Sequence, residues 1–160
     1  MTLAEAILVV KLTIAVAGAQ TPYDNLSWVP VQDVYCLGLV GYHEMRQFKH
    51  DDECELLAMM TVLTRSAYPG WPSDVCTVAR QRDQFAPKIK YGASALDDPK
   101  AWARSVALAV RAYTTPDLDK TLPVASPTHF HLVGEKPDWA KSGEVRHLKR
   151  TCNSDWYRSQ

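Results

Sequence analysis

The segment DVYCLGLVGYHEMR, residues 33–46, guides the interpretation of the rest of the chain. Asp33 is positioned to cap the N-terminus of a helix. Apolar residues then recur at the spacing of a helix with one buried face: Val34, Leu37 and Val40. This helix carries Glu44 directly after an apolar run, and partial burial raises the pKa of a carboxyl group. Arg46 acts in the opposite direction, because an ion pair would lower the pKa of Glu44.

Helices are also predicted on both sides of this segment. Asp52 followed by Glu55 is a capping-box-like start, and Ser73 is positioned to cap a short helix. Asp98 followed by Pro99 places proline in the first turn of another helix. The predicted helices cover residues 4–17, 33–46, 52–66, a short segment from 73, and 98–114. One stripe of the third helix is predicted to be buried: Leu56, Met59, Met60 and Leu63.

After Pro127 the residue pattern changes from helical spacing to the alternation of a strand. Residues 128–133 alternate, are rich in β-forming types and end at Gly134, which predicts a strand. The last 25 residues are expected to return as a second strand. The predicted fold class is therefore α+β, mainly α-helical, with a small antiparallel sheet. A chain of 160 residues is the size of one domain.

Charge and cysteine content narrow the classes of function. Lysine plus arginine equals aspartate plus glutamate, 18 to 18, so no net field directs the protein to nucleic acid. The cysteines lie far apart, without a Cys-x-x-Cys pair, which argues against a zinc knuckle. They are Cys36, Cys54, Cys76 and Cys152. Two disulfides in any of three pairings, or buried free thiols, are equally compatible with this spacing.

The N-terminal segment is apolar from Leu3 to Ala19 and ends in Ala17-Gly18-Ala19, which resembles a signal-peptidase site. Glu5 and Lys11 are atypical of an export signal. We therefore expect residues 1–30 to form an uncleaved apolar helix and loop packed on a main domain of residues 31–160. Peripheral membrane contact through residues 3–19 is a further expectation.

Two constellations suggest other chemistries. His129 and His131 are two apart on the predicted strand and face the same side, so with His147 or Asp155 they would form a zinc site of an amidase or peptidase. Cys54 lies in the first turn of a predicted helix, where a thiolate is favoured, as in a cysteine peptidase.

Taken in order, several motifs resemble the cell-wall hydrolase family typified by the spore-cortex lytic enzyme SleB, which includes bacteriophage lysins. The family pattern joins an aromatic-x-Glu-Ala-Arg motif, an apolar helix, a Pro/Cys turn, a Gln-Phe pair, a Thr-His-x-His strand, a Pro-x-Trp-Ala motif and a histidine near a terminal Phe-Tyr pair. The matching segments are Tyr42/Glu44/Arg46, Leu56 to Arg65, Trp71 to Cys76, Gln84-Phe85, Pro127 to His131, Pro137 to Ala140 and Trp156-Tyr157. Two departures are Gln47-Phe48 in place of Gly-Glu and Asp155 where the family has a histidine.

The resemblance implies a lysozyme-like domain of the lytic transglycosylase type that cleaves peptidoglycan. It implies Glu44 as the catalytic acid and base, with neither metal nor cofactor. It also implies a substrate groove lined by Tyr42, Arg46, Gln84, Phe85, His129 and His131. The expected protein is a monomeric phage lysin, virion-associated or exported, that acts in the bacterial periplasm or cell wall. The alternatives are a secreted bacterial enzyme, a lysozyme-type muramidase, a zinc- or cysteine-dependent peptidoglycan amidase or endopeptidase, and a non-catalytic wall-binding protein.

Overall fold

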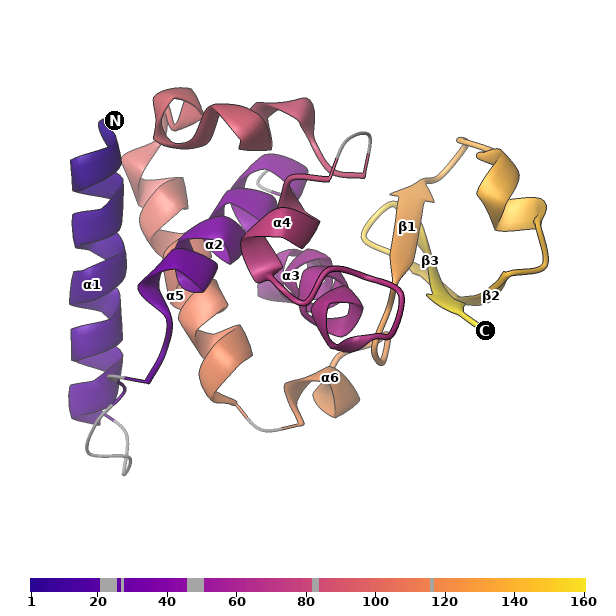
Figure 1. The fold of residues 1–160 in the computed structure, drawn as a ribbon, viewed down its shortest axis with the longest axis horizontal. Coiled ribbons are helices and arrows are strands. Elements are labelled where there is room, and N and C mark those ends of the chain that lie inside the picture. Colours follow the sequence, from indigo (N-terminus) through magenta and orange to yellow (C-terminus); the bar gives the residue numbers. More distant parts are fainter. Residues whose placement is uncertain (21–25, 27, 46–50, 82–83, 116) are drawn as a thin grey trace.

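The computed structural model describes residues 1–20, 26, 28–45, 51–81, 84–115 and 117–160 (Figure 1). A body of helices is followed by a small sheet at one end of the molecule (Figure 1). The elements are α1 (Leu3–Gln20), α2 (Val31–Met45), α3 (Asp52–Ala67), α4 (Val75–Ala79), η1 (Pro87–Ala95), α5 (Pro99–Thr114), α6 (Leu118–Thr121), β1 (His129–Leu132), η2 (Asp138–Lys141), β2 (Val145–Thr151) and β3 (Ser154–Ser159). The predicted mainly helical α+β class is confirmed.

Helix α2 forms the centre of the body and contacts α1, α3, α4, α5 and η1. It is buried on every side, because apolar and small residues surround its axis from Val34 to Tyr42. Gly38 allows α5 to approach closely. A Cβ atom at this position would lie 2.9 Å from the ring of Trp102.

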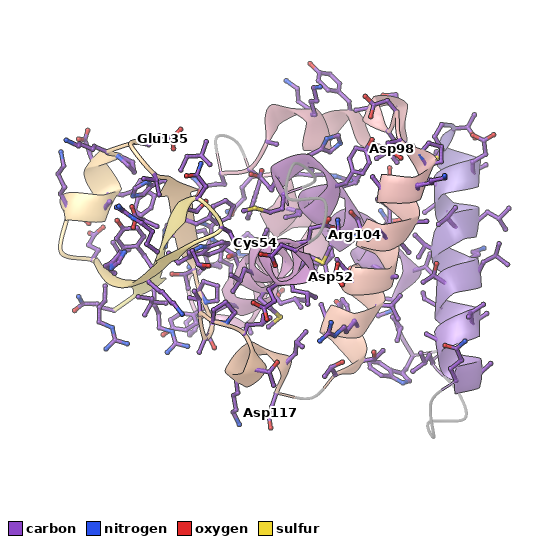
Figure 2. All side chains as sticks on the ribbon, turned by 180° about the vertical axis from the view of Figure 1, so that it is seen from behind. Asp52, Cys54, Asp98, Arg104, Asp117 and Glu135 are labelled. Carbon is purple, nitrogen blue, oxygen red and sulfur yellow. A yellow bond between two sulfur atoms is a disulfide. The ribbon has the colours of Figure 1, made fainter. Side chains whose placement is uncertain are left out.

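The start of α3 differs from the prediction. Asp51 is the N-cap, and its carboxylate accepts from the backbone N–H of Glu53 and of Cys54. Asp52 and Glu55 do not form a capping box, since both carboxylates pair with Arg104 of α5 at 2.8 and 3.0 Å (Figure 2). Tertiary pairing thus shifts the cap by one residue.

Two further caps can be compared with the sequence. Asp98 caps α5 with Pro99 in the first turn, as predicted. The cap of α4 is Asp74, which accepts from Thr77 N at 2.6 Å, and not Ser73.

Helix α2 begins at Val31, two residues before the predicted cap. Asp33 lies inside its first turn and accepts a hydrogen bond from Tyr113 Oη at 2.6 Å. In α3, the predicted stripe is fully buried at Leu56 and Met59 and half-buried at Met60 and Leu63.

The sheet has three antiparallel strands in the order β1-β3-β2. The C-terminal segment predicted to be one strand is therefore two, joined by a tight turn at Cys152-Asn153, where both residues have positive φ. Asparagine tolerates this conformation better than most residues. Trp156 is fully buried and stacks on Phe130 at 4.7 Å between ring centroids, which joins the sheet to the hydrophobic core of the helical body.

Two disulfides settle the open pairing of the cysteines. Cys36–Cys76 joins α2 to α4, and Cys54–Cys152 joins the start of α3 to the β2–β3 turn. No cysteine is free, so the free-thiol alternative is wrong. Disulfides favour an oxidising, extracytoplasmic environment.

Helix α1 packs on α5 and α2 through a narrow stripe of small and aliphatic side chains: Ala6, Val10 and Ile14. Its opposite face exposes more than half of Leu8, Leu12 and Val16. By length and composition, the helix is apolar enough to cross a membrane, as an N-terminal signal sequence also is. It is longer at both ends than the predicted range 4–17.

Candidate active site

Glu44 lies in the last turn of α2, where the helix reaches the segment that precedes η1. Its Oε1 accepts a hydrogen bond from the backbone N–H of Ala86. Burial raises the pKa of Glu44 to about 6, and the Ala86 hydrogen bond opposes only part of this effect. The predicted upward direction is confirmed. Arg46, expected to lower this pKa and to bind substrate, lies outside the described residues.

Tyr42 was predicted to line the substrate groove, and the structure places it in the core instead. Its side chain is fully buried in the core. The hydroxyl donates to Asp97 Oδ1 at 2.5 Å and accepts from Asp98 N at 2.9 Å. Tyr42 therefore fixes the start of α5 and does not line a groove, because none of its surface reaches solvent.

Arg65 joins the helical body to the sheet. Its side chain is buried, and Nε donates to Thr128 O at 2.6 Å, just before β1. The guanidinium lies 4.3 Å from the Trp71 ring centroid and 5.2 Å from that of Phe85. Burial lowers the pKa of Arg65 to about 10, so the group stays cationic at neutral pH. Two aromatic rings are thus held around one buried charge.

Phe85 brings this cluster beside Glu44. The ring lies 6.3 Å from Phe130 of β1, and the next residue, Ala86, supplies the N–H that holds Glu44. Phe85 is itself mostly buried, whereas the preceding Gln84 is exposed. Of this predicted pair, Gln84 is therefore the residue whose side chain reaches solvent, and Phe85 packs against Arg65 and Phe130.

His129 and His131 lie on the same face of β1, as the alternation predicted. Both rings pack against Trp139, with centroids 5.0 and 5.6 Å away. Trp71 approaches His129 from the other side at 5.6 Å. Burial and then the charge of Arg65 lower the pKa of His129 to about 4, so its imidazole is neutral above that pH.

His131 is held by hydrogen bonds at both ring nitrogens. Nδ1 lies 2.9 Å from its neighbour's carbonyl, Leu132 O, and Nε2 lies 3.0 Å from Tyr157 Oη. Because a carbonyl only accepts, Nδ1 is the donor to Leu132 O, and in a neutral ring Nε2 is then the acceptor for the Tyr157 hydroxyl. His131 thus serves to orient Tyr157.

The predicted zinc ligands do not converge. The Asp155 carboxylate pairs with Arg150 at 2.7 Å and with His147 at 3.0 Å, and Arg150 foremost lowers the pKa of Asp155 to about 2. In the described ranges, one group has metal-ligand spacing: Asp51, Cys54 and Cys152. Its cysteines form a disulfide and therefore offer no thiolate.

Three features of the site had no clear signal in the sequence. The Ala86 N–H is a backbone group, and no side-chain pattern marks it. Arg65 and Tyr157 are visible in the sequence only as the ends of motifs. The contact of Arg65 with Thr128 depends on how α3 meets the sheet, and that of Tyr157 with His131 depends on the pairing of β1 with β3.

Compared with known proteins, the chain matches no family model, no curated protein and no solved structure. The functional proposal therefore rests on the residues and contacts described above.

Proposed function

We propose that the chain is a peptidoglycan-cleaving glycosidase of the lytic transglycosylase type, with Glu44 as its acid and base. The observation that carries this proposal is the position of Glu44: the Ala86 N–H holds its carboxyl group, burial raises its pKa to about 6, and the residue before Ala86 is Phe85, whose ring lies near Arg65 and Phe130. A carboxyl group with such a pKa is protonated below about pH 6 and still has a minor acid fraction at neutral pH, so it can both donate a proton to a leaving oxygen and take one back.

The reaction needs one carboxyl group in two roles. Protonated Glu44 donates its proton to the oxygen that links N-acetylmuramic acid to N-acetylglucosamine, and the bond from that oxygen to the muramyl C1 breaks. The Glu44 carboxylate then takes the proton of the muramyl 6-hydroxyl as this oxygen bonds to C1 and closes the 1,6-anhydro ring. Glu44 ends protonated, ready for the next cycle, and no water is consumed.

The Ala86 N–H suits this exchange of roles. It donates to one carboxyl oxygen and so orients the group. The N–H interacts more strongly with the carboxylate than with the acid, which moderates the pKa that burial alone would give.

Sugar rings would bind over the aromatic residues that flank His129. Trp71 and Trp139 are half-buried, so each keeps a solvent-facing part. Both lie within 6 Å of the His129 ring, and Trp139 also contacts Tyr157. Aromatic faces bind the apolar faces of sugars, and a neutral His129 adds a hydrogen-bonding group without a charge.

Two other reaction types, a cysteine nucleophile and a hydrolytic muramidase, have less support from the structure. A cysteine nucleophile has no support, since no thiol is free. A muramidase that releases its product by hydrolysis needs a second carboxylate or a held water. Asp51 already caps α3, and Asp52 already pairs with Arg104. The exposed Glu53 is the third carboxylate of this segment, and the Glu53→Gln variant below tests it. The single-carboxylate reaction is therefore favoured.

The proposed setting is the cell wall, reached as a monomeric phage lysin or as a secreted enzyme, with α1 in peripheral contact with a membrane. Two disulfides and the exposed apolar face of α1 support this setting.

The test is release of dye from purified, dye-labelled peptidoglycan by the wild type, Glu44→Gln and Glu53→Gln. We expect Glu44→Gln to lose at least about a hundredfold in rate, because an amide cannot donate the required proton. Glu53 is an exposed glutamate of α3 and serves as the matched control, with activity unchanged. Full activity of Glu44→Gln would overturn the assignment. Wall binding without release by the wild type would indicate a non-catalytic protein.

A further inference from the structure

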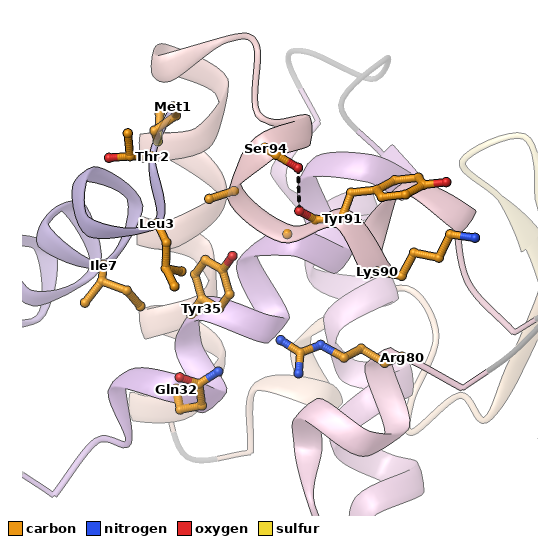
Figure 3. Close-up of a pocket in the computed structure, with 12 residues that line it drawn as sticks. Met1, Thr2, Leu3, Ile7, Gln32, Tyr35, Arg80, Lys90, Tyr91 and Ser94 are labelled. Atoms are coloured by element: carbon orange, nitrogen blue, oxygen red, sulfur yellow. Dashed lines mark hydrogen bonds between the residues drawn. The ribbon is translucent and has the colours of Figure 1, made fainter.

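A cavity of about 450 Å³ lies at the end of α2 that is remote from Glu44 (Figure 3). Gln32, in the first turn of α2, lines it, and twelve residues of helix correspond to about 18 Å. The other walls come from the start of α1, from η1 and from the residue that follows α4. The cavity is therefore separate from the proposed catalytic site.

The charge of this cavity has one sign. Arg80 and Lys90 line it, and no aspartate or glutamate does. In the part of the chain that the structure describes, neither cation has a carboxylate within ion-pair distance. The Asp74 carboxylate interacts electrostatically with Arg80 but is occupied in capping α4. Two cations without direct acidic partners favour an anionic ligand.

The cations lie on different sides of the opening. In Figure 3 the Arg80 guanidinium extends toward Tyr35 and Gln32, whereas Lys90 extends beside Tyr91. Lys90 Nζ lies 5.0 Å from the Tyr91 ring centroid. Figure 3 shows the Lys90 ammonium pointing away from the Arg80 guanidinium, so a phosphate at Arg80 meets Lys90 only when this exposed side chain turns toward the cavity. Guanidinium and ammonium groups both bind phosphate oxygens.

Apart from the amino group of Met1, which donates to Leu96 O, the rest of the lining is uncharged. Leu3 and Ile7 of α1 form an apolar wall, and the Tyr35 ring forms a buried floor. Gly92 has φ +56°, and a Cβ atom there would lie 2.8 Å from Tyr35 Oη. Glycine thus allows η1 to turn beside Tyr35. The combination accepts a ligand with an apolar or ring-shaped part next to its charge.

We propose that this cavity binds a phosphate group attached to an apolar part, with Arg80 and Lys90 holding the phosphate. The volume fits a small organic ligand, since such sites usually measure about 300–1,000 Å³. A soluble phosphomonoester and a phospholipid headgroup share this chemistry. The inference goes beyond the proposed function and does not depend on it.

The test is isothermal titration calorimetry of the full chain with three probes: phenyl phosphate, inorganic phosphate and monomeric dihexanoyl-phosphatidylglycerol. Phenol is the uncharged control. Arg80→Gln and Lys90→Gln each remove one positive charge from an exposed side chain, so both variants are expected to melt at the wild-type temperature. Lys88→Gln is the matched control, because Lys88 is exposed on the same element but does not line the cavity.

We expect phenyl phosphate to bind, phenol not to bind, and each of the two cavity variants to weaken binding at least tenfold. Lys88→Gln should stay within twofold of the wild type. Tighter binding of the lipid than of phenyl phosphate supports a lipid headgroup, and the reverse order supports a soluble ligand. The absence of binding by all three phosphate probes overturns the proposal, as does wild-type affinity in either cavity variant. Glu44→Gln should bind as the wild type does, which keeps this result independent of catalysis.

Discussion

The backbone N–H of Ala86 donates a hydrogen bond to the carboxyl group of Glu44, 42 residues earlier in the chain. This bond joins the end of the central helix to the segment that carries Phe85. Phe85 in turn contacts Arg65 and Phe130, which connect α3 and β1. One buried acid is thereby tied to three parts of the fold, which is how a fixed geometry for proton transfer can be maintained.

Replacement of Glu44 by glutamine is expected to stabilise the protein at neutral pH. The pKa of Glu44 is raised from 4.5 to about 6, so the unfolded chain loses this proton at lower pH than the folded protein does. The wild type therefore loses stability as pH rises from about 4.5 through 6, by up to about 2 kcal/mol.

Urea unfolding at pH 4 and pH 8 measures this difference. The variant should match the wild type at pH 4 and exceed it by about 2 kcal/mol at pH 8. Glu53→Gln, at an exposed position, should show no such dependence. An equal effect of Glu44→Gln at both pH values would contradict the raised pKa.

Replacement of Arg65 by methionine is expected to destabilise the protein by about 2–3 kcal/mol, since the carbonyl of Thr128 loses its donor. It should also raise the pKa of His129, because the charge of Arg65 is one of the two causes that lower it. Burial is the larger cause, so the pKa should stay below 6.5. NMR titration of His129 measures it, with Arg111→Met, on the exposed side of α5, as the control. An unchanged pKa would show that Arg65 does not influence this ring.

The disulfide between Cys54 and Cys152 is expected to matter more for stability than that between Cys36 and Cys76. The bonds close segments of 98 and 40 residues, and loop-closure entropy gives about 4.7 and about 4 kcal/mol respectively. Paired cysteine-to-serine variants, compared by urea unfolding, check the order. Greater loss from the α2–α4 pair would show that packing, and not loop length, decides the effect.

Trp139→Ala is expected to raise KM for peptidoglycan fragments about tenfold or more, because the ring is proposed to stack on sugar. Trp28→Ala is the matched control, since Trp28 is 59% exposed and precedes α2 far along the chain from the sheet. Steady-state kinetics with soluble glycan strands separates KM from kcat. Equal effects of both substitutions would assign Trp139 a structural role only.

Local patterns in the sequence predicted the helices well where the caps and apolar spacing agree. The Asp98-Pro99 start of α5 is an example, because a proline in the first turn and an aspartate before it have few other uses. The prediction failed where a tertiary contact competes with a local one. Asp52 has the right type for a cap but pairs with Arg104 from a distant helix, and Asp51 takes its place.

The candidate site was predictable to a smaller extent. The alternation in β1 placed His129 and His131 on one face, and the apolar run before Glu44 predicted the direction of its pKa. Tyr42, two residues from Glu44, is in the core, because successive helix positions point in different directions. The position of a backbone donor such as the Ala86 N–H is set by the course of the folded chain, so the pattern of side chains in the sequence does not predict it.

Mass spectrometry of the soluble products from purified peptidoglycan, digested by the wild type and by Glu44→Gln side by side, tests the central claim most directly. We expect disaccharide-peptides that end in 1,6-anhydromuramic acid from the wild type and none from the variant. Intact glycan strands with cleaved peptides, or the same anhydro products from both proteins, would contradict it.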